Sequence, residues 1–193
     1  MHGMRDAGMA AVAKHFPGHG AVVADSHIAL PVDRRELADL DGDLAPYRVL
    51  IANALPAVMV AHVVFPHIDP RPASLSARWI RGVLRGDLGF DGAVFADDLS
   101  MAGAAAFGAI EERAALAIEA GCDVLPVCND RAQVARLLER PGARVEPVSA
   151  MRLVRLHGRA MPPLAELQAD RRWQGASAAA AALLERPPLQ LDA

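Results

Sequence analysis

The sequence predicts an α/β fold made of four βα units, the arrangement from which (β/α)8 TIM barrels are built. Short apolar runs alternate along the chain with longer segments whose apolar residues recur every three or four positions. Some runs are apolar throughout, which is typical of parallel strands buried on both faces. Polar side chains follow directly where the runs end. Because four strands cannot close an eight-stranded barrel, the chain holds either about half of such a barrel or a smaller open sheet.

Each expected strand is followed by an expected helix. Ser76 is the expected N-cap of the second helix, and Gly121 is the expected glycine at the end of the third. Two further helices are expected after Pro141, where the alternation stops. The strands are expected at residues 10–16, 57–61, 92–96 and 123–127, the helices that follow them at 36–54, 76–84, 101–120 and 131–138, and the last two helices at 147–156 and 163–184.

We therefore expect a single domain over residues 1–193. The βα units occupy residues 1–140, and the C-terminal helices occupy residues 141–193. A chain of this length can bury a sizeable hydrophobic core.

Composition argues against several classes of partner. The formal net charge is −3 and there is no basic tail, so nucleic acid is a poor candidate. No apolar run approaches the ~20 residues needed to cross a bilayer, and the first residues lack the layout of a signal peptide. Cys122 and Cys128 are too few and too close for a disulfide framework. We expect both to be core thiols of a protein in the reducing cytoplasm.

Clusters of polar side chains follow three of the predicted strands. The first covers residues 14–20 and continues to Asp25 and His27, the second is His62, and the third covers residues 97–100. A single histidine or aspartate at a strand end is more often structural than catalytic, and for His62 alone we favour that role. Catalytic groups of (β/α) barrels, however, gather at the carboxyl ends of the strands. The clustering therefore favours a functional site.

Two chemistries could use these clusters. A hydrolytic metal site would draw on imidazoles and a carboxylate, but no compact pair of ligands on a helix is present, and Lys14, the only lysine of the chain, would repel a cation. A glycosidase needs a nucleophilic carboxylate and a group that protonates the leaving oxygen. Asp25, two residues before His27, could accept a hydrogen bond from one ring nitrogen and fix the tautomer. The glycosidase interpretation fits the residues better.

The motifs resemble those of glycoside hydrolase family three β-N-acetylglucosaminidases, which are bacterial cytoplasmic enzymes of cell-wall recycling. The resemblance extends from the first residues to about Leu138 and, more loosely, through the C-terminal helices. Matched motifs in the right order are a specific signal. They are Lys14-His15-Phe16-Pro17-Gly18-His19-Gly20, Asp25-Ser26-His27, residues 69–74, Leu88-Gly89-Phe90-Asp91-Gly92, residues 96–101 and residues 120–123.

The resemblance implies a role for each matched residue. Asp97 is the implied nucleophile, His27 the implied acid/base and Asp25 the acidic partner of His27. Lys14 and His15 are implied to hold the hydroxyl groups of the sugar. The implied reaction is hydrolysis, with retention, of a terminal N-acetylglucosamine β-1,4-linked in a muropeptide, with no cofactor and no metal.

The resemblance also implies that the chain holds only the C-terminal half of the barrel, because members of the family carry the first half ahead of the Lys14 motif. An open half-barrel leaves two strand edges unpaired and one apolar face uncovered, so we expect self-association through that half-barrel. The alternatives are an inactive truncated fragment, a sugar-binding remnant and, third, a metal-dependent hydrolase.

Overall fold

The computed structural model describes residues 1–22, 30–139 and 146–184. Two compact units are present, Met1–Gly158 and Arg159–Ala193. The second contains α7 (Leu164–Ala169) and α8 (Arg171–Leu184). The first contains, in chain order, α1 (His2–Asp6), β1 (Val12–Phe16), η1 (Leu37–Leu40), α2 (Asp41–Ala52), β2 (Ala57–Val60), β3 (Val64–Phe65), β4 (Asp69–Pro72), η2 (Ala73–Leu75), η3 (Arg78–Asp87), β5 (Ala93–Phe95), α3 (Ala102–Ala105), α4 (Ile110–Ala120), α5 (Arg131–Leu138) and α6 (Pro147–Val154).

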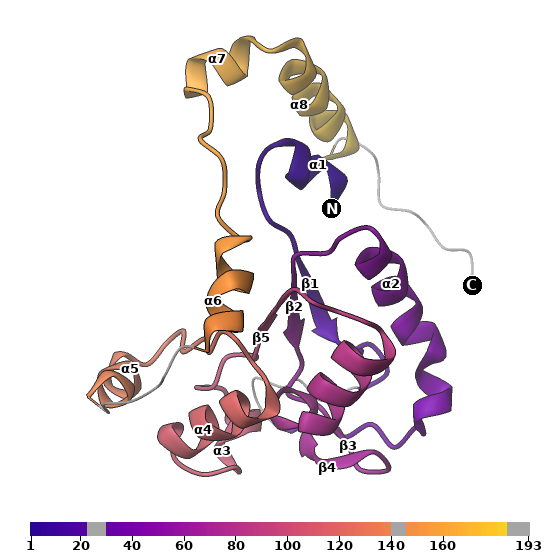
Figure 1. Cartoon of the computed structure of the whole chain (residues 1–193). Helices are drawn as coiled ribbons and strands as arrows, with labels where there is room; N and C mark the ends of the chain where they lie inside the picture. The colour runs from indigo at the N-terminus through magenta and orange to yellow at the C-terminus, as the bar shows by residue number, and fades with distance from the viewer. Residues whose placement is uncertain (23–29, 140–145, 185–193) are drawn as a thin grey trace. The chain divides into compact units, whose positions relative to one another are not determined.

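A parallel sheet with the order β1-β2-β5 forms the centre of the first unit (Figure 1). Ala57 pairs with Val12 on one side and with Ala93 on the other, so the three strands run in register. The register between β1 and β2 shifts between Ala13 and Phe16. The sheet is open, as expected for part of a barrel.

The core fills the space between one face of this sheet and the helices. Phe16, at the end of β1, contacts Tyr47 of α2 and Trp79 of η3 edge-on, with ring centroids 5.1 Å and 6.0 Å apart. Val58, Val60 and Val94 have no accessible surface. On the opposite face the paired residues Met59 and Phe95 are only half-buried. The sheet therefore has one packed face and one partly open face.

The helix predictions are largely confirmed, with two breaks. Ser76, the expected N-cap, lies one residue before Ala77, the N-cap of η3, and its Oγ accepts a hydrogen bond from Trp79 N at 3.2 Å. Gly121 ends α4 with φ +111°, a left-handed conformation that glycine adopts without a steric penalty. The helix expected over 101–120 is divided into α3 and α4, because Gly108 has φ +101° and interrupts it. The helix expected over 163–184 is divided between α7 and α8.

The prediction of a fourth strand over residues 123–127 was wrong in the length of that strand. Val124 forms a single parallel bridge with Phe95, and Ala96 N donates to Val124 O at 3.0 Å. Pro126 has no N–H with which to continue a ladder. Its carbonyl instead accepts a hydrogen bond from Leu99 N at 2.9 Å, in the loop beyond β5. The segment continues the sheet at one point and then supports the residues that follow β5.

The antiparallel pair β3–β4 was not expected from the sequence. It follows β2 directly, and its short strands carry no alternating pattern long enough to predict a hairpin. Phe65 of β3 has no accessible surface and contacts the Trp79 ring at 4.9 Å between centroids. The hairpin therefore covers one end of the core.

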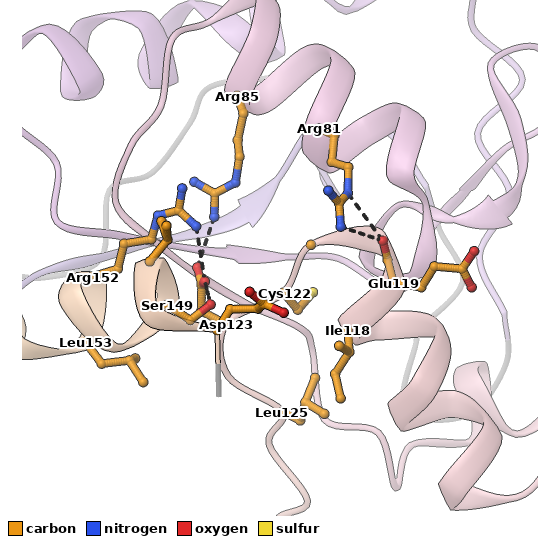
Figure 2. Close-up of a pocket in the computed structure, with 13 residues that line it drawn as sticks. Arg81, Arg85, Ile118, Glu119, Cys122, Asp123, Leu125, Ser149, Arg152 and Leu153 are labelled. Carbon is orange, nitrogen blue, oxygen red and sulfur yellow. Dashed lines mark hydrogen bonds and ion pairs between the residues drawn. The ribbon is translucent and has the colours of Figure 1, made fainter. Parts of the chain in front are cut away.

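A hollow of about 650 Å³ lies beside the amino ends of β5 and of the segment that contains Val124. Its walls come from η3, α4, α6 and the chain between α4 and α5 (Figure 2). Arg81 donates to Glu119 O on one side, while Arg85 and Arg152 point toward Asp123 on the other.

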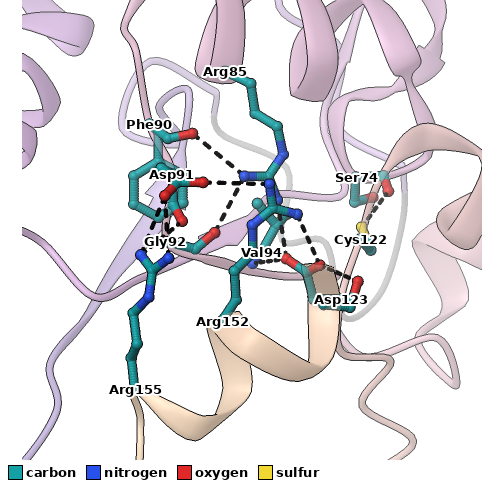
Figure 3. A network of polar contacts seen from close by, with 11 residues as sticks. Ser74, Arg85, Phe90, Asp91, Gly92, Val94, Cys122, Asp123, Arg152 and Arg155 are labelled. Carbon is teal, nitrogen blue, oxygen red and sulfur yellow. Dashed lines mark hydrogen bonds and ion pairs between the residues drawn. The ribbon is translucent and has the colours of Figure 1, made fainter. Parts of the chain in front are cut away.

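Asp123 is the centre of a polar network at this end of the sheet (Figure 3). Its side chain is 1% exposed. Oδ2 accepts from Arg85 at 2.9 Å and from Val94 N at 2.8 Å, and Oδ1 accepts from the Ser149 hydroxyl at 2.5 Å. Arg152 of α6 lies 3.3 Å from Oδ1. This carboxylate therefore joins η3, β5 and α6.

We expect Asp123→Asn to lower the free energy of unfolding by about 3 kcal/mol, because the guanidinium groups of Arg85 and Arg152, which are only 16% and 15% exposed, would lose the counter-charge that they share. Urea denaturation at neutral pH measures the change. The matched control is Asp91→Asn, since Asp91 pairs with Arg152 and with Arg155, the residue that follows α6, but its side chain is 69% exposed. That variant should lose less than about 1 kcal/mol. Equal losses in the two variants would contradict the central role given to Asp123.

Candidate active site

Three chemically active side chains lie at the carboxyl edge of the sheet. His15 belongs to the last part of β1, His62 comes two residues after β2, and Asp97 comes two residues after β5. Because the strands are parallel, their carboxyl ends meet at the same edge. His15 Nε2 lies 4.0 Å from Asp97 Oδ2. The structure thus brings the first and third sequence clusters together across β2.

The two neighbouring aspartates have different environments. The Asp97 side chain is 12% exposed, its Oδ1 accepts a hydrogen bond from Asp98 N at 2.9 Å, and its Oδ2 faces His15. Asp98 Oδ1 accepts from Ser100 N at 2.9 Å, from Ser100 Oγ at 2.7 Å and from Cys128 N at 3.1 Å. Burial alone would raise the pKa of Asp98, but these hydrogen bonds outweigh it and hold the pKa below its usual value. Asp98 holds the loop, and Asp97 keeps one oxygen available for chemistry.

Of the two residues expected to hold the sugar, the structure places His15 beside Asp97. His15 has a side chain that is 30% exposed, and Lys14 next to it is exposed on β1. The imidazole of His19, from the glycine-rich stretch after β1, lies edge-on to that of His15 with ring centroids 6.1 Å apart. A cation and two imidazoles at this edge could donate hydrogen bonds to hydroxyl oxygens.

Asp25 and His27 lie outside the described residues, within the segment 23–29. Their expected roles stay predictions that follow from the sequence resemblance.

His62 is buried, with no accessible surface. Its Nδ1 lies 2.5 Å from Ser74 Oγ, and its Nε2 lies 3.0 Å from Asp98 O. Burial lowers the pKa of His62, and the nearby carboxylates oppose this effect more weakly. The imidazole therefore holds the backbone beside Asp97, in agreement with a structural role for this histidine.

Two supporting residues were missed by the sequence analysis. Arg113 of α4 is buried, and its guanidinium donates to Leu99 O and to Gln133. Its position was detectable, because residue 113 falls at the three- and four-residue spacing of the apolar positions Ile110 and Ala117. Ser74 gave no signal beyond its place in the motif at 69–74.

The two cysteines differ. Cys122 is buried as expected, and burial raises the pKa of its thiol. The prediction of a core thiol was wrong for Cys128, which is exposed. Its backbone N–H is used by Asp98 at the carboxyl edge of the sheet, and this contact holds the residue at the surface instead of in the core.

Residues 1–22, 30–139 and 146–184 contain no group of three or more His, Cys, Asp or Glu side chains placed to hold a metal ion. A helix of sufficient length and apolarity to cross a bilayer is likewise absent from the described parts of the chain.

Comparison with known proteins identifies close relatives. A beta-hexosaminidase of Thioalkalivibrio sulfidiphilus is 50% identical over 192 residues, which cover 100% of this chain and 55% of the relative. One of Alkalilimnicola ehrlichii is 53% identical over 176 residues, with 90% and 50% covered. The chain therefore spans about half the length of the curated relatives it matches.

Solved structures are also similar. NagZ from Neisseria gonorrhoeae in complex with N-trifluoroacetyl-D-glucosamine superposes with a TM-score of 0.84 at 40% identity, covering 95% of this chain and 54% of that one. A glycoside hydrolase family 3 beta-N-acetylglucosaminidase from Paenibacillus sp. has a TM-score of 0.72, also at 40% identity, with 84% and 34% covered.

The sequence of residues 1–151 matches the family model of the glycosyl hydrolase family 3 N-terminal domain. With the partial parallel barrel, the open carboxyl edge and the relatives above, this match shows that the chain belongs to glycosyl hydrolase family 3.

Proposed function

We propose that this chain supplies the C-terminal half of the catalytic barrel of a retaining exo-β-N-acetylglucosaminidase. The observation that carries the proposal is the position of Asp97, whose Oδ2 faces His15 at the carboxyl edge of the sheet. Carboxyl ends of barrel strands carry the catalytic groups in such folds. The beta-hexosaminidase relatives and a solved neighbour bound to a glucosamine derivative support the same substrate class.

In the proposed mechanism Asp97 Oδ2 attacks the anomeric carbon, and the bond from that carbon to the leaving oxygen breaks. His27, oriented by Asp25, gives its proton to the leaving oxygen. The product of this step is a glycosyl ester on Asp97. His27, now neutral, then takes a proton from water, the water oxygen displaces the carboxylate, and the sugar is released with retained configuration.

A histidine suits this task because its pKa lies near neutral pH. Imidazole begins at about 6.5, and a neighbouring carboxylate raises the pKa. The proposed roles of Lys14 and His15 are to hold the sugar hydroxyls beside Asp97. We extend the proposal to a muropeptide that carries a terminal β-1,4-linked N-acetylglucosamine, hydrolysed during peptidoglycan recycling in the cytoplasm.

The second candidate is a chain that binds the sugar without turning it over, or that gains activity only after self-association. The half-buried Met59 and Phe95 on the partly open face of the sheet favour it, because a reaction beside a partly open face is poorly shielded from water. An aryl N-acetylglucosaminide assay of the purified chain, repeated across protein concentrations, separates these candidates. Turnover proportional to concentration supports the first, a steeper dependence supports self-association, and binding of N-acetylglucosamine without turnover supports a sugar-binding remnant.

We expect Asp97→Ala to lower kcat on every aryl N-acetylglucosaminide by on the order of a thousandfold or more, equivalent to at least about 4 kcal/mol. Added azide should restore turnover, because the small anion can occupy the space of the lost carboxylate and attack the anomeric carbon. The product should be the α-glycosyl azide, which is detected by NMR. Asp98→Ala is the matched control. It should lower stability and gain nothing from azide, whereas rescue of that variant alone would assign the nucleophile to Asp98.

We expect His27→Ala to lower the rate on substrates with poor leaving groups by about 10²–10⁴-fold, the usual contribution of a general acid. Substrates with dinitrophenol as the leaving group need no proton and should lose much less rate in the first step. A plot of log rate against leaving-group pKa measures the difference. Asp25→Asn should give an intermediate slope, and an unchanged slope in His27→Ala would show that another group is the acid.

A further inference from the structure

The peptide that follows Asp98 is held at both of its polar atoms. Asp98 O accepts hydrogen bonds from His62 Nε2 and from Met101 N, each at 3.0 Å, and Leu99 N donates to Pro126 O at 2.9 Å. The preceding peptide N–H, that of Asp98, donates to Asp97 Oδ1 at 2.9 Å. His62 is therefore connected to the Asp97 carboxylate through a single residue of backbone.

The partners of His62 determine its tautomer. A carbonyl oxygen can only accept, so Nε2 must carry a proton to bind Asp98 O. In a neutral ring Nδ1 then accepts, and the Ser74 hydroxyl donates to it across 2.5 Å. Ser74 is itself buried, and its carbonyl accepts from the Cys122 thiol at 3.5 Å. Both nitrogens are satisfied without a charge on the ring.

We propose that His62 is a positioning residue, held by Ser74 as the neutral Nε2–H tautomer, which fixes the Asp98 backbone and thereby the orientation of the Asp97 carboxylate. This inference rests on the proposed function, in which Asp97 is the nucleophile. It gives His62 and Ser74 no contact with the substrate.

The charges around His62 agree with a neutral ring. Asp97 and Asp98 are the carboxylates close enough to favour its protonation, and Arg113 opposes it. Burial has a larger effect than any of the three and lowers the pKa. A charged imidazole would also require Nδ1 to become a donor, and it would place a cation against the carboxylate that must attack the sugar. A neutral His62 ring leaves the negative charge of the Asp97 carboxylate available for attack on the sugar.

The tautomer can be measured without any assay of activity. Long-range ¹H–¹⁵N correlation spectra of the ¹⁵N-histidine-labelled chain separate the two neutral tautomers from the protonated ring, and His62→Gln assigns the signal. We expect a neutral Nε2–H ring at pH 7 and above. A ring protonated at pH 7, or one with its proton on Nδ1, would overturn the proposal.

The effect on the reaction is tested with two buried serines. Ser74→Ala removes the donor to Nδ1, so the ring can adopt its other tautomer and lose its hydrogen bond to Asp98 O, which then keeps only the one from Met101 N. We expect kcat to fall about tenfold or more with little change in KM. Ser76→Ala is the matched control, because Ser76 binds Asp69 and Trp79 N and does not contact His62. His62→Gln, whose amide can still donate to Asp98 O, should retain more activity than His62→Met.

Cys128 offers a second measurement independent of turnover. Desolvation and, after it, the negative charge of the Asp98 carboxylate raise the pKa of the exposed Cys128 thiol, while Cys122 is buried. Loss of the His62 hydrogen bond to Asp98 in Ser74→Ala should therefore change the rate at which a disulfide reagent labels Cys128 in the folded chain, and Ser76→Ala should leave that rate unchanged. Equal rates in wild type and Ser74→Ala would contradict the positioning role.

These outcomes separate the two proposals. If the chain turns over no substrate, the proposed function fails, and the tautomer and the Cys128 labelling rate still decide the role of His62. If turnover is normal in Ser74→Ala, the positioning role fails and the proposed function stands.

Stability should also depend on His62 through pH. Its pKa is lowered in the folded state, so the unfolded chain takes up a proton first as the pH falls below about 6.5. The contribution of His62 to stability is therefore complete above that pH and is lost as the pH falls toward the folded-state pKa. Between the unfolded-state pKa and the folded-state pKa, the unfolding constant of the wild type should rise by up to tenfold for each unit by which the pH falls, relative to that of His62→Gln. Urea denaturation from pH 7.5 to 5 measures this change. Parallel pH profiles in the two proteins would overturn the neutral assignment.

Discussion

The parallel pairing of β2 with β1 and β5 is the constraint on which the rest of the structure depends. Ala57 pairs with Val12 and Ala93 at the same level, so the carboxyl ends of all three strands finish at one edge. His15, His62 and Asp97 are far apart in the sequence, and no contact between neighbours along the chain would bring them together. A shift of register by one residue would turn each side chain to the other face of the sheet.

The polar side chains at the two ends of the sheet have different roles. At the amino end, Asp123 joins η3, β5 and α6 through buried charged hydrogen bonds. At the carboxyl end the polar groups support one carboxylate, Asp97, and leave one of its oxygens available. Asp98 shows how this is achieved, because three donors hold its own carboxylate in the loop. Adjacent residues of the same type thus differ in role through the partners that the fold gives them.

The sequence predicted the parts of this structure that depend on local pattern. Periodic apolar residues predicted the positions of α2, α4, α5 and α6. Continuous apolar runs predicted β2 and β5, because strands that are buried on both faces are apolar throughout. The β3–β4 hairpin and the reduction of the fourth strand to a bridge at Val124 were not predictable in this way. They depend on partners distant in sequence, such as Pro126 O and Leu99 N. For the same reason the sequence predicted Asp97 as a site residue but could not reveal that Ser74 holds His62.

The outer edge of β1 has a consequence for work with the isolated chain. In the described residues β1 pairs with a strand on one side only, and Val12 is 42% exposed. An edge of this kind offers free N–H and C=O groups to any extended segment that meets it. Pairing of two chains along this edge, where it occurs, increases with expression level and storage concentration. Dilution, a solubilising fusion partner or an added complementary peptide should suit purification better than high salt, which strengthens apolar contact.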